Sequence, residues 1–142
     1  MKLKKILFFA FLIFVFVSCS NKENNFSELI PEDSSKKVSA EIKEFKNDII
    51  TYELKNHKDL SYTFSDFYIV YRLNKNKWEE LLMNQNIKSN LFKLKPSEYK
   101  EITLQLPNNF SKNFKGIFRI RKPFVYDEKN EMENVDMIFE IK

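Results

Sequence analysis

Apolar and polar residues alternate with a period of two, at short intervals, from Val38 to the end of the chain. This period is typical of β-strands that turn one face toward a core, because successive side chains of a strand point to opposite sides. The pattern predicts several short strands. Their predicted inward residues are Ile50, Tyr52 and Leu54; Phe67, Ile69, Tyr71 and Leu73; Ile102, Leu104 and Leu106; Phe118 and Ile120; and Val135, Met137, Phe139 and Ile141.

One stretch also permits a helix. Residues 77–86 contain Trp78, Leu81 and Leu82, which a short helix could place together, but residues 74–77 have the composition of a hairpin turn, which favours a strand. Short strands without a long helical period favour one all-β domain, a sandwich or a barrel. Residues 38–142 are close in length to an immunoglobulin-type β-sandwich of roughly 100 residues.

The N-terminus has a different pattern. Three lysines in the first five residues precede an apolar run from Ile6 to Val17, and Ser18 and Cys19 follow. This is the order of a secretory signal peptide, and the run is shorter than the ~20 residues that a membrane-spanning helix needs. The sequence predicts a signal peptide over residues 1–18.

Residues 16–19, Phe-Val-Ser-Cys, resemble a bacterial lipobox, although Phe16 stands where Leu is usual. The resemblance implies cleavage before Cys19 and acylation of its thiol, with palmitate among the acyl chains. More than one chain gives stable membrane attachment. We therefore expect a lipid-anchored protein of the bacterial cell membrane or outer membrane, facing the periplasm or the exterior.

The segment after the lipid, residues 19–37, is polar apart from Phe26, Leu29 and Ile30. So little apolar surface does not offset the entropy lost on ordering, which predicts a flexible tether. The alternative is that residues 26–30 dock as an added edge strand. The folded domain is predicted to span residues 38–142.

The composition excludes several classes of site. With one cysteine, one histidine and one glycine, the chain cannot form an internal disulfide, a structural zinc site or a glycine-rich phosphate loop. Removal of three lysines with the signal lowers the formal charge from +4 to +1. We therefore expect no cofactor and no nucleic-acid partner.

Three segments, residues 74–78, 94–104 and 115–122, resemble motifs of a family of bacterial immunoglobulin-like domains. In that family a Trp follows a lysine-rich turn, a Leu-Lys-Pro-Gly-Glu turn leads into a strand, and a Gly-Lys-Tyr-Arg strand comes near the end. The likeness covers residues 49–142. It implies an immunoglobulin-like antiparallel β-sandwich, often carried by lipoproteins, without known enzyme activity.

This chain departs from the family pattern at two positions. Ser97 stands in place of the glycine, so we expect a turn that needs no positive φ there. Phe118 replaces the tyrosine, so packing must replace a tyrosine-corner hydrogen bond. Gly116 is expected to serve backbone geometry.

The sequence offers little for catalysis. His57 lies in a polar loop with Asp59 and Ser61, but neighbours in one loop do not provide the constrained nucleophile of a catalytic triad. We expect no enzyme activity.

A candidate binding face follows from the predicted strand phases, which turn Tyr68, Arg72, Arg119 and Arg121 outward on one sheet. Tyrosine and arginine are enriched in binding hot spots, and the arginine fork suits carboxylate or phosphate. The alternative is a half-solvated face on which arginine stems cover apolar surface and pair with acids.

A second candidate is a calcium-binding loop of carboxylates near the end of the chain. The alternative is a solvated acidic loop, because the spacing is not that of an EF-hand. The acidic residues are Asp127, Glu128, Glu131 and Glu133, followed by Asp136.

Together these features predict a cell-envelope lipoprotein that displays one immunoglobulin-like domain for protein–protein interaction or adhesion. The alternatives are an inhibitor or accessory domain of an envelope enzyme, and a module that binds a small ligand or calcium.

Overall fold

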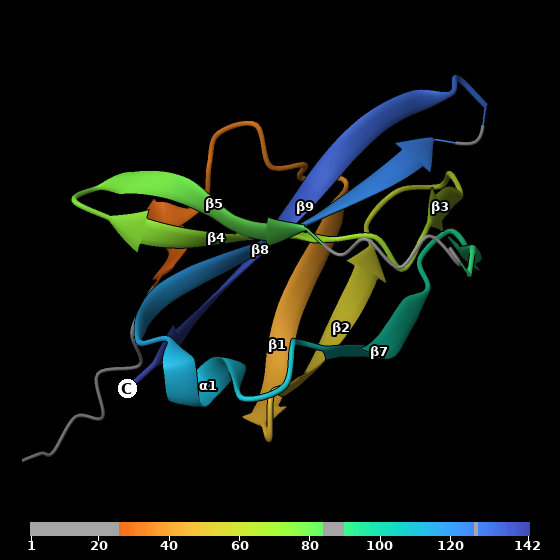
Figure 1. Cartoon of the computed structure of the whole chain (residues 1–142). Coiled ribbons are helices and arrows are strands. Elements are labelled where there is room, and N and C mark those ends of the chain that lie inside the picture. Colours follow the sequence, from red (N-terminus) through yellow and green to blue (C-terminus); the bar gives the residue numbers. More distant parts are fainter. Residues whose placement is uncertain (1–25, 84–89, 127) are drawn as a thin grey trace, which may run out of the picture.

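The computed structural model describes residues 26–83, 90–126 and 128–142, and these form two antiparallel sheets packed face to face (Figure 1). One sheet has three strands in the order β1-β2-β7; the other has the order β5-β4-β8-β3-β6, with β9 paired to β8. The all-β immunoglobulin-like sandwich is thus confirmed. The strands are β1 (Val38–Lys46), β2 (Ile49–Asn56), β3 (Tyr62–Phe64), β4 (Ile69–Asn74), β5 (Lys77–Met83), β6 (Phe92–Leu94), β7 (Tyr99–Gln105), β8 (Gly116–Tyr126) and β9 (Glu131–Ile141), with a helical turn, α1 (Phe110–Asn113), before β8.

Most predicted inward residues do form the core. The side chains of the predicted sets in β2, β8 and β9 are all buried, and so are Leu104 and Leu106 beside half-buried Ile102. Burial of this apolar surface between the sheets is the main force that holds them together. Residues 77–83 form a strand, as the turn before Trp78 predicts.

The predicted phase of residues 67–73 is wrong. Tyr68 and Val70 are buried in the core, whereas Tyr71 and Leu73 lie half-buried on the other face. Apart from Arg72, every residue of this stretch is apolar or aromatic, so the sequence does not distinguish the inward face of the strand from its outward face. The hydroxyl of the buried Tyr68 donates a hydrogen bond to the Gln105 carbonyl at 2.8 Å, and this bond links the two sheets.

The turn at Ser97 also differs from the prediction. Ser97 has a φ of 57°, the left-handed conformation for which the family uses glycine. The turn is held by two hydrogen bonds, from the Lys95 N–H to the Glu98 carboxylate at 2.7 Å and from the Glu98 N–H to the Lys95 carbonyl at 3.1 Å. Gly116 has a φ of 117°, so its backbone role is confirmed.

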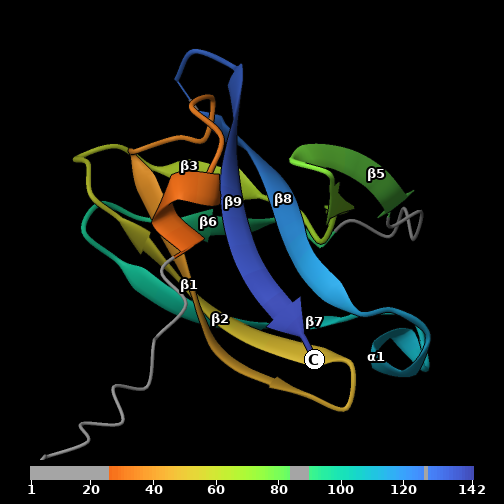
Figure 2. The same ribbon diagram turned by 90° about the vertical axis from the view of Figure 1, so that its left-hand side faces the viewer.

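Residues 26–37, which we call the N-terminal segment, are docked in the structure, where the sequence predicts a flexible tether. Residues 26–29 form a short 3-10 helix, η1 (Phe26–Leu29), instead of an edge strand. The following residues run beside β9 (Figure 2), where Ser34 forms a parallel bridge with Asn134 and the Ser35 N–H donates to the Asn134 carbonyl at 2.7 Å. Polar contacts hold this segment against β9. The prediction of a tether was based on the low apolar content of the segment, which says nothing about such contacts.

Strand β8 is the centre of the large sheet, but one of its edges is interrupted. Strand β9 pairs along its whole length, whereas the other edge is shared by β4, opposite residues 118–121, and β3, opposite residues 124–126. Lys122 lies at the gap, only 2% exposed, and its Nζ donates to the carbonyls of Ser65 at 2.8 Å and Phe67 at 3.2 Å. A lysine side chain therefore replaces strand pairing at this point.

Burial lowers the pKa of Lys122 from 10.5 to about 8, although the nearby Asp66 carboxylate opposes the shift. Between pH 8 and pH 10 the unfolded chain therefore holds a proton that the native state has released, so stability should rise with pH. We expect Lys122 to contribute a rise of about 2 kcal/mol to the free energy of unfolding, measured by urea denaturation as the difference between the protein and a variant without this amine. The buried tyrosines, whose pKa values are raised, oppose this rise near pH 10 in both proteins.

Substitution Lys122→Met should remove this contribution, because the titrating amine is removed. The exposed loop variant Lys58→Met is the control and should keep it. The same rise in Lys122→Met as in the unsubstituted protein would assign the pH dependence to other groups.

Candidate functional site

The outer face of the large sheet carries two arginines in an apolar setting. Residues directly opposite on paired strands share a face, and β8 places Arg119 beside Tyr71 of β4 and Ile138 of β9, and Arg121 beside Ile69 and Asp136. We call this surface the arginine face. It consists of Ile69, Tyr71, Leu73, Trp78, Glu80, Ile117, Arg119, Arg121, Asp136, Ile138 and Glu140.

Arg119 is held by two aromatic rings. The centre of its guanidinium lies 4.1 Å from the ring centroid of Tyr71 and 4.9 Å from that of Trp78. Cation–π attraction of this kind is strongest where the cation is desolvated, and Arg119 is only 6% exposed. Burial lowers the pKa of Arg119. Its Nε has no hydrogen-bond partner among the described residues, and the nearest carboxylate oxygen, Asp136 Oδ1, is 3.7 Å away.

Arg121 is held by two carboxylates. Its Nε and Nη2 donate to the two oxygens of Asp136 at 2.9 and 3.0 Å, and its Nη1 and Nη2 donate to the two oxygens of Asp33 at 2.8 Å each. These hydrogen bonds raise the pKa of Arg121 and lower that of Asp33. Both Asp136 oxygens accept from Arg121, whereas Arg119 Nε, at 3.7 Å from Asp136 Oδ1, is too far away to donate to it.

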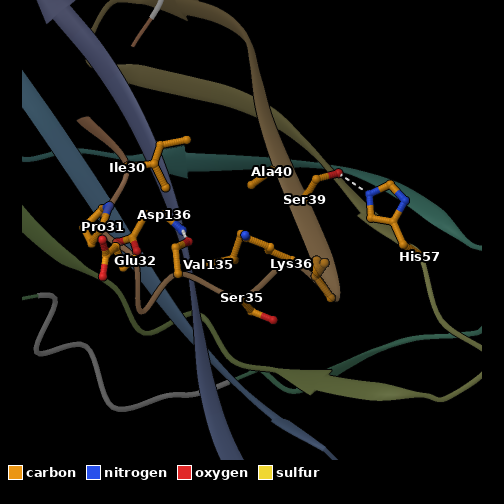
Figure 3. Close-up of a pocket in the computed structure, with 12 residues that line it drawn as sticks. Ile30, Pro31, Glu32, Ser35, Lys36, Ser39, Ala40, His57, Val135 and Asp136 are labelled. Carbon is orange, nitrogen blue, oxygen red and sulfur yellow. Dashed lines mark hydrogen bonds between the residues drawn. The ribbon is translucent and has the colours of Figure 1, made fainter. Parts of the chain in front are cut away.

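A groove of about 740 Å³ lies between the N-terminal segment and strands β1 and β9 (Figure 3). Asp136, which belongs to the arginine face, also lines one end of this groove. At the other end the Ser39 hydroxyl and His57 Nε2 are 2.7 Å apart, both on exposed residues. The lining residues are Ile30, Pro31, Glu32, Ser34, Ser35, Lys36, Val38, Ser39, Ala40, His57, Val135 and Asp136.

Of the predicted binding face, the structure brings together only Arg119 and Arg121. Tyr68 points into the core because the strand phase is inverted. Arg72 shares the phase of Phe118 and donates from Nη2 to the Lys115 carbonyl at 2.9 Å, near the end of the sheet. The aromatic partners Tyr71 and Trp78 were not predicted, because the predicted strand phase turned Tyr71 inward; the opposite phase places them beside the arginines.

The predicted calcium loop is not assembled by the described residues. Glu128 accepts a hydrogen bond from the Tyr126 hydroxyl at 2.7 Å, and Glu133 binds Ser35 and Lys37. Glu131 is exposed, and Asp127 lies outside the described residues. In the described part of the chain no three His, Cys, Asp or Glu side chains are grouped to hold a metal ion.

The predicted lipid site, Cys19, also lies outside the described residues. Within the described ranges, none of the helices has the length and apolar character needed to cross a membrane.

Replacement of Asp136 by Asn should destabilise the protein, because an amide leaves the buried Arg119 and the half-buried Arg121 without their shared anion. We expect a loss of about 3 kcal/mol in the free energy of unfolding, measured by urea denaturation. Glu131→Gln, an exposed change on the same strand, should alter it by less than about 0.5 kcal/mol. If Asp136→Asn lowered the free energy of unfolding no more than Glu131→Gln does, other groups would have to compensate the arginine charges.

Comparison with known proteins identifies the fold family. None of the curated proteins compared with the chain matches it. Among solved structures, an X-ray structure of a Northeast Structural Genomics Consortium target has a TM-score of 0.41 at 14% identity, covering 75% of this chain and 87% of its own.

Two further structures are similar in part. The archaellum periplasmic stator protein FlaG from Sulfolobus acidocaldarius has a TM-score of 0.41 at 16% identity, over 72% of this chain and 99% of that protein. A calcium-binding mutant of Bacteroides uniformis beta-glucuronidase 2 has a TM-score of 0.35 at 11% identity, over 78% of this chain and 14% of that enzyme. The sequence profile of the bacterial Ig-like domain family matches residues 33–136, and the chain therefore belongs to that family.

Proposed function

We propose that this protein is a lipid-anchored component of the bacterial cell envelope whose Ig-like domain binds another protein through the arginine face. Membership of the bacterial Ig-like family supports a role as an interaction or adhesion module. The proposed mechanism is non-covalent. The domain presents one sheet face to its partner while Cys19 holds it at a membrane.

The observation that carries this proposal is the contrast between the two outer faces of the sandwich. On the three-stranded sheet the centre of the outer face is polar, with Thr51, Glu53, Lys55, Glu101 and Thr103, and its two exposed apolar side chains, Ile49 and Tyr99, lie far apart at opposite ends of the β2–β7 pair. The arginine face instead combines half-buried aliphatic side chains with tyrosine, tryptophan and arginine, the types most enriched in binding hot spots. An apolar sheet face with buried charges at its centre suits a partner better than it suits solvent.

The membrane anchor is supported by the sequence alone. The basic, apolar and small residues of positions 1–19 have the order of a lipoprotein signal, and the cysteine stands where the lipid is attached.

Replacement of Cys19 by Ala should release the protein from the membrane fraction, because the attachment point for acyl chains is lost. Fractionation of cells and metabolic labelling with a fatty acid measure the effect, and Ser20→Ala, one residue further, is the matched control. Persistent membrane association of Cys19→Ala, together with absence of label on the unsubstituted protein, would contradict lipidation.

A photoreactive benzoylphenylalanine at Leu73, on the arginine face, should cross-link to a discrete envelope protein in living cells. The same residue at Tyr99, which is 69% exposed on the outer face of the other sheet, is the control and should give no such product. Equal products from both positions, or a product only from position 99, would contradict the assignment of the binding face.

A further inference from the structure

We propose that the arginine face is a binding site for an acidic peptide segment, and that Asp33 of the protein's own N-terminal segment occupies this site when no partner is bound. The inference rests on the proposed function, since it names the partner's chemistry at the same face. It also makes the N-terminal segment a competitor of the partner.

The buried centre of the face needs a second anion, because the other carboxylates on the face, Glu80 and Glu140, lie on its two outer strands. Arg119 and Arg121 carry two positive charges, and the fully buried Asp136 supplies one negative charge. Both Asp136 oxygens accept from Arg121, while Arg119 Nε remains buried without a partner among the described residues. Aromatic and aliphatic neighbours keep water away, so the unbalanced charge is costly and attracts another carboxylate.

Asp33 provides that carboxylate, and it lies where a carboxylate of another molecule could take its place. Its two oxygens accept from Arg121 in a bidentate pair at 2.8 Å, the geometry in which an arginine fork binds a carboxylate best. Yet its side chain is 62% exposed, whereas that of Asp136 is 0% exposed. An incoming carboxylate can therefore reach Arg121 from the solvent side that Asp33 now covers.

Few apolar contacts hold the N-terminal segment, although the Ser35 N–H donates to the Asn134 carbonyl at 2.7 Å and the Asp136 N–H donates to the Ser34 hydroxyl at 3.1 Å. The segment's contacts with β9 are mostly polar and partly exposed, such as the ion pair between Lys37 and Glu133, and pairs of this kind add little stability. Ile30 remains 43% exposed, and the groove of about 740 Å³ separates the segment from β1 (Figure 3). A segment with few buried apolar contacts opens at a small free-energy cost.

The surroundings favour a peptide as the ligand. A glutamate or aspartate of the partner would take the place of Asp33 on Arg121, and apolar residues next to it in the peptide would cover Ile69, Leu73 and Trp78. The arginine fork also accepts phosphate, but an ion without apolar groups would gain nothing from these neighbours.

The test uses the full chain purified in detergent micelles, titrated calorimetrically with a capped hexapeptide of alternating Glu and Val. Asp33→Asn should bind it roughly tenfold more tightly than the unsubstituted protein, because the fraction of open sites no longer limits the apparent affinity. Glu32→Gln removes an equal charge from the adjacent exposed residue and should leave the affinity unchanged. Adding Arg121→Lys to Asp33→Asn should weaken binding, since lysine has no fork.

Several results would overturn the inference. They are equal affinities for Asp33→Asn and the unsubstituted protein, an equal gain in Glu32→Gln, equal binding of the matched Gln–Val peptide, or binding of inorganic phosphate as tight as that of the acidic peptide. Melting temperatures of the variants check that each is folded. If the acidic peptide does not bind while cross-links from position 73 persist, the proposed acidic ligand is contradicted and the proposed protein–protein interaction is not.

Discussion

Asp136 is the buried carboxylate on which the outer face of the large sheet depends. It lies directly opposite Arg121 across the β8–β9 pair and 3.7 Å from Arg119 Nε, so one anion serves two cations. Its backbone N–H also donates to the Ser34 hydroxyl at 3.1 Å, which ties the N-terminal segment to the same point. Removal of Asp136 is costly, because the buried charge of Arg119 then has neither an anion nor water beside it.

Strand β8 carries two buried basic side chains, Arg119 and Lys122, and the half-buried Arg121, and each is compensated in a different way. Arg119 is stacked against aromatic rings, Arg121 is bound by carboxylates, and Lys122, on the opposite face, donates to backbone carbonyls. The polar partners come from β9, from the N-terminal segment and from the loop between β3 and β4. The strand thus connects three parts of the chain through its basic side chains.

Sequence patterning predicted the sandwich and the inward phases of β2, β7, β8 and β9, because polar and apolar residues alternate there with clear contrast. It failed for Tyr68 and Val70, where neighbours on both faces are apolar or aromatic and only tertiary packing decides which face is buried. The candidate site was half predicted. Arg119 and Arg121 follow from alternation on β8, but their partner Asp33 is far away in the sequence and belongs to a segment whose composition suggests a tether.

The positions of β8 and β9 in the chain bear on the order of folding. Three hairpins, β1–β2, β4–β5 and β8–β9, pair neighbours in sequence, and their turns carry residues such as Asn47, Asn76 and Asn130 at positive φ. Short loops of this kind close with little loss of chain entropy. The large sheet, however, is centred on β8, to which β3, β4 and β9 all pair. A chain that is synthesised from its N-terminus therefore cannot complete this sheet before β8 and β9 are available. Until then the apolar faces of β3 and β4 stay exposed.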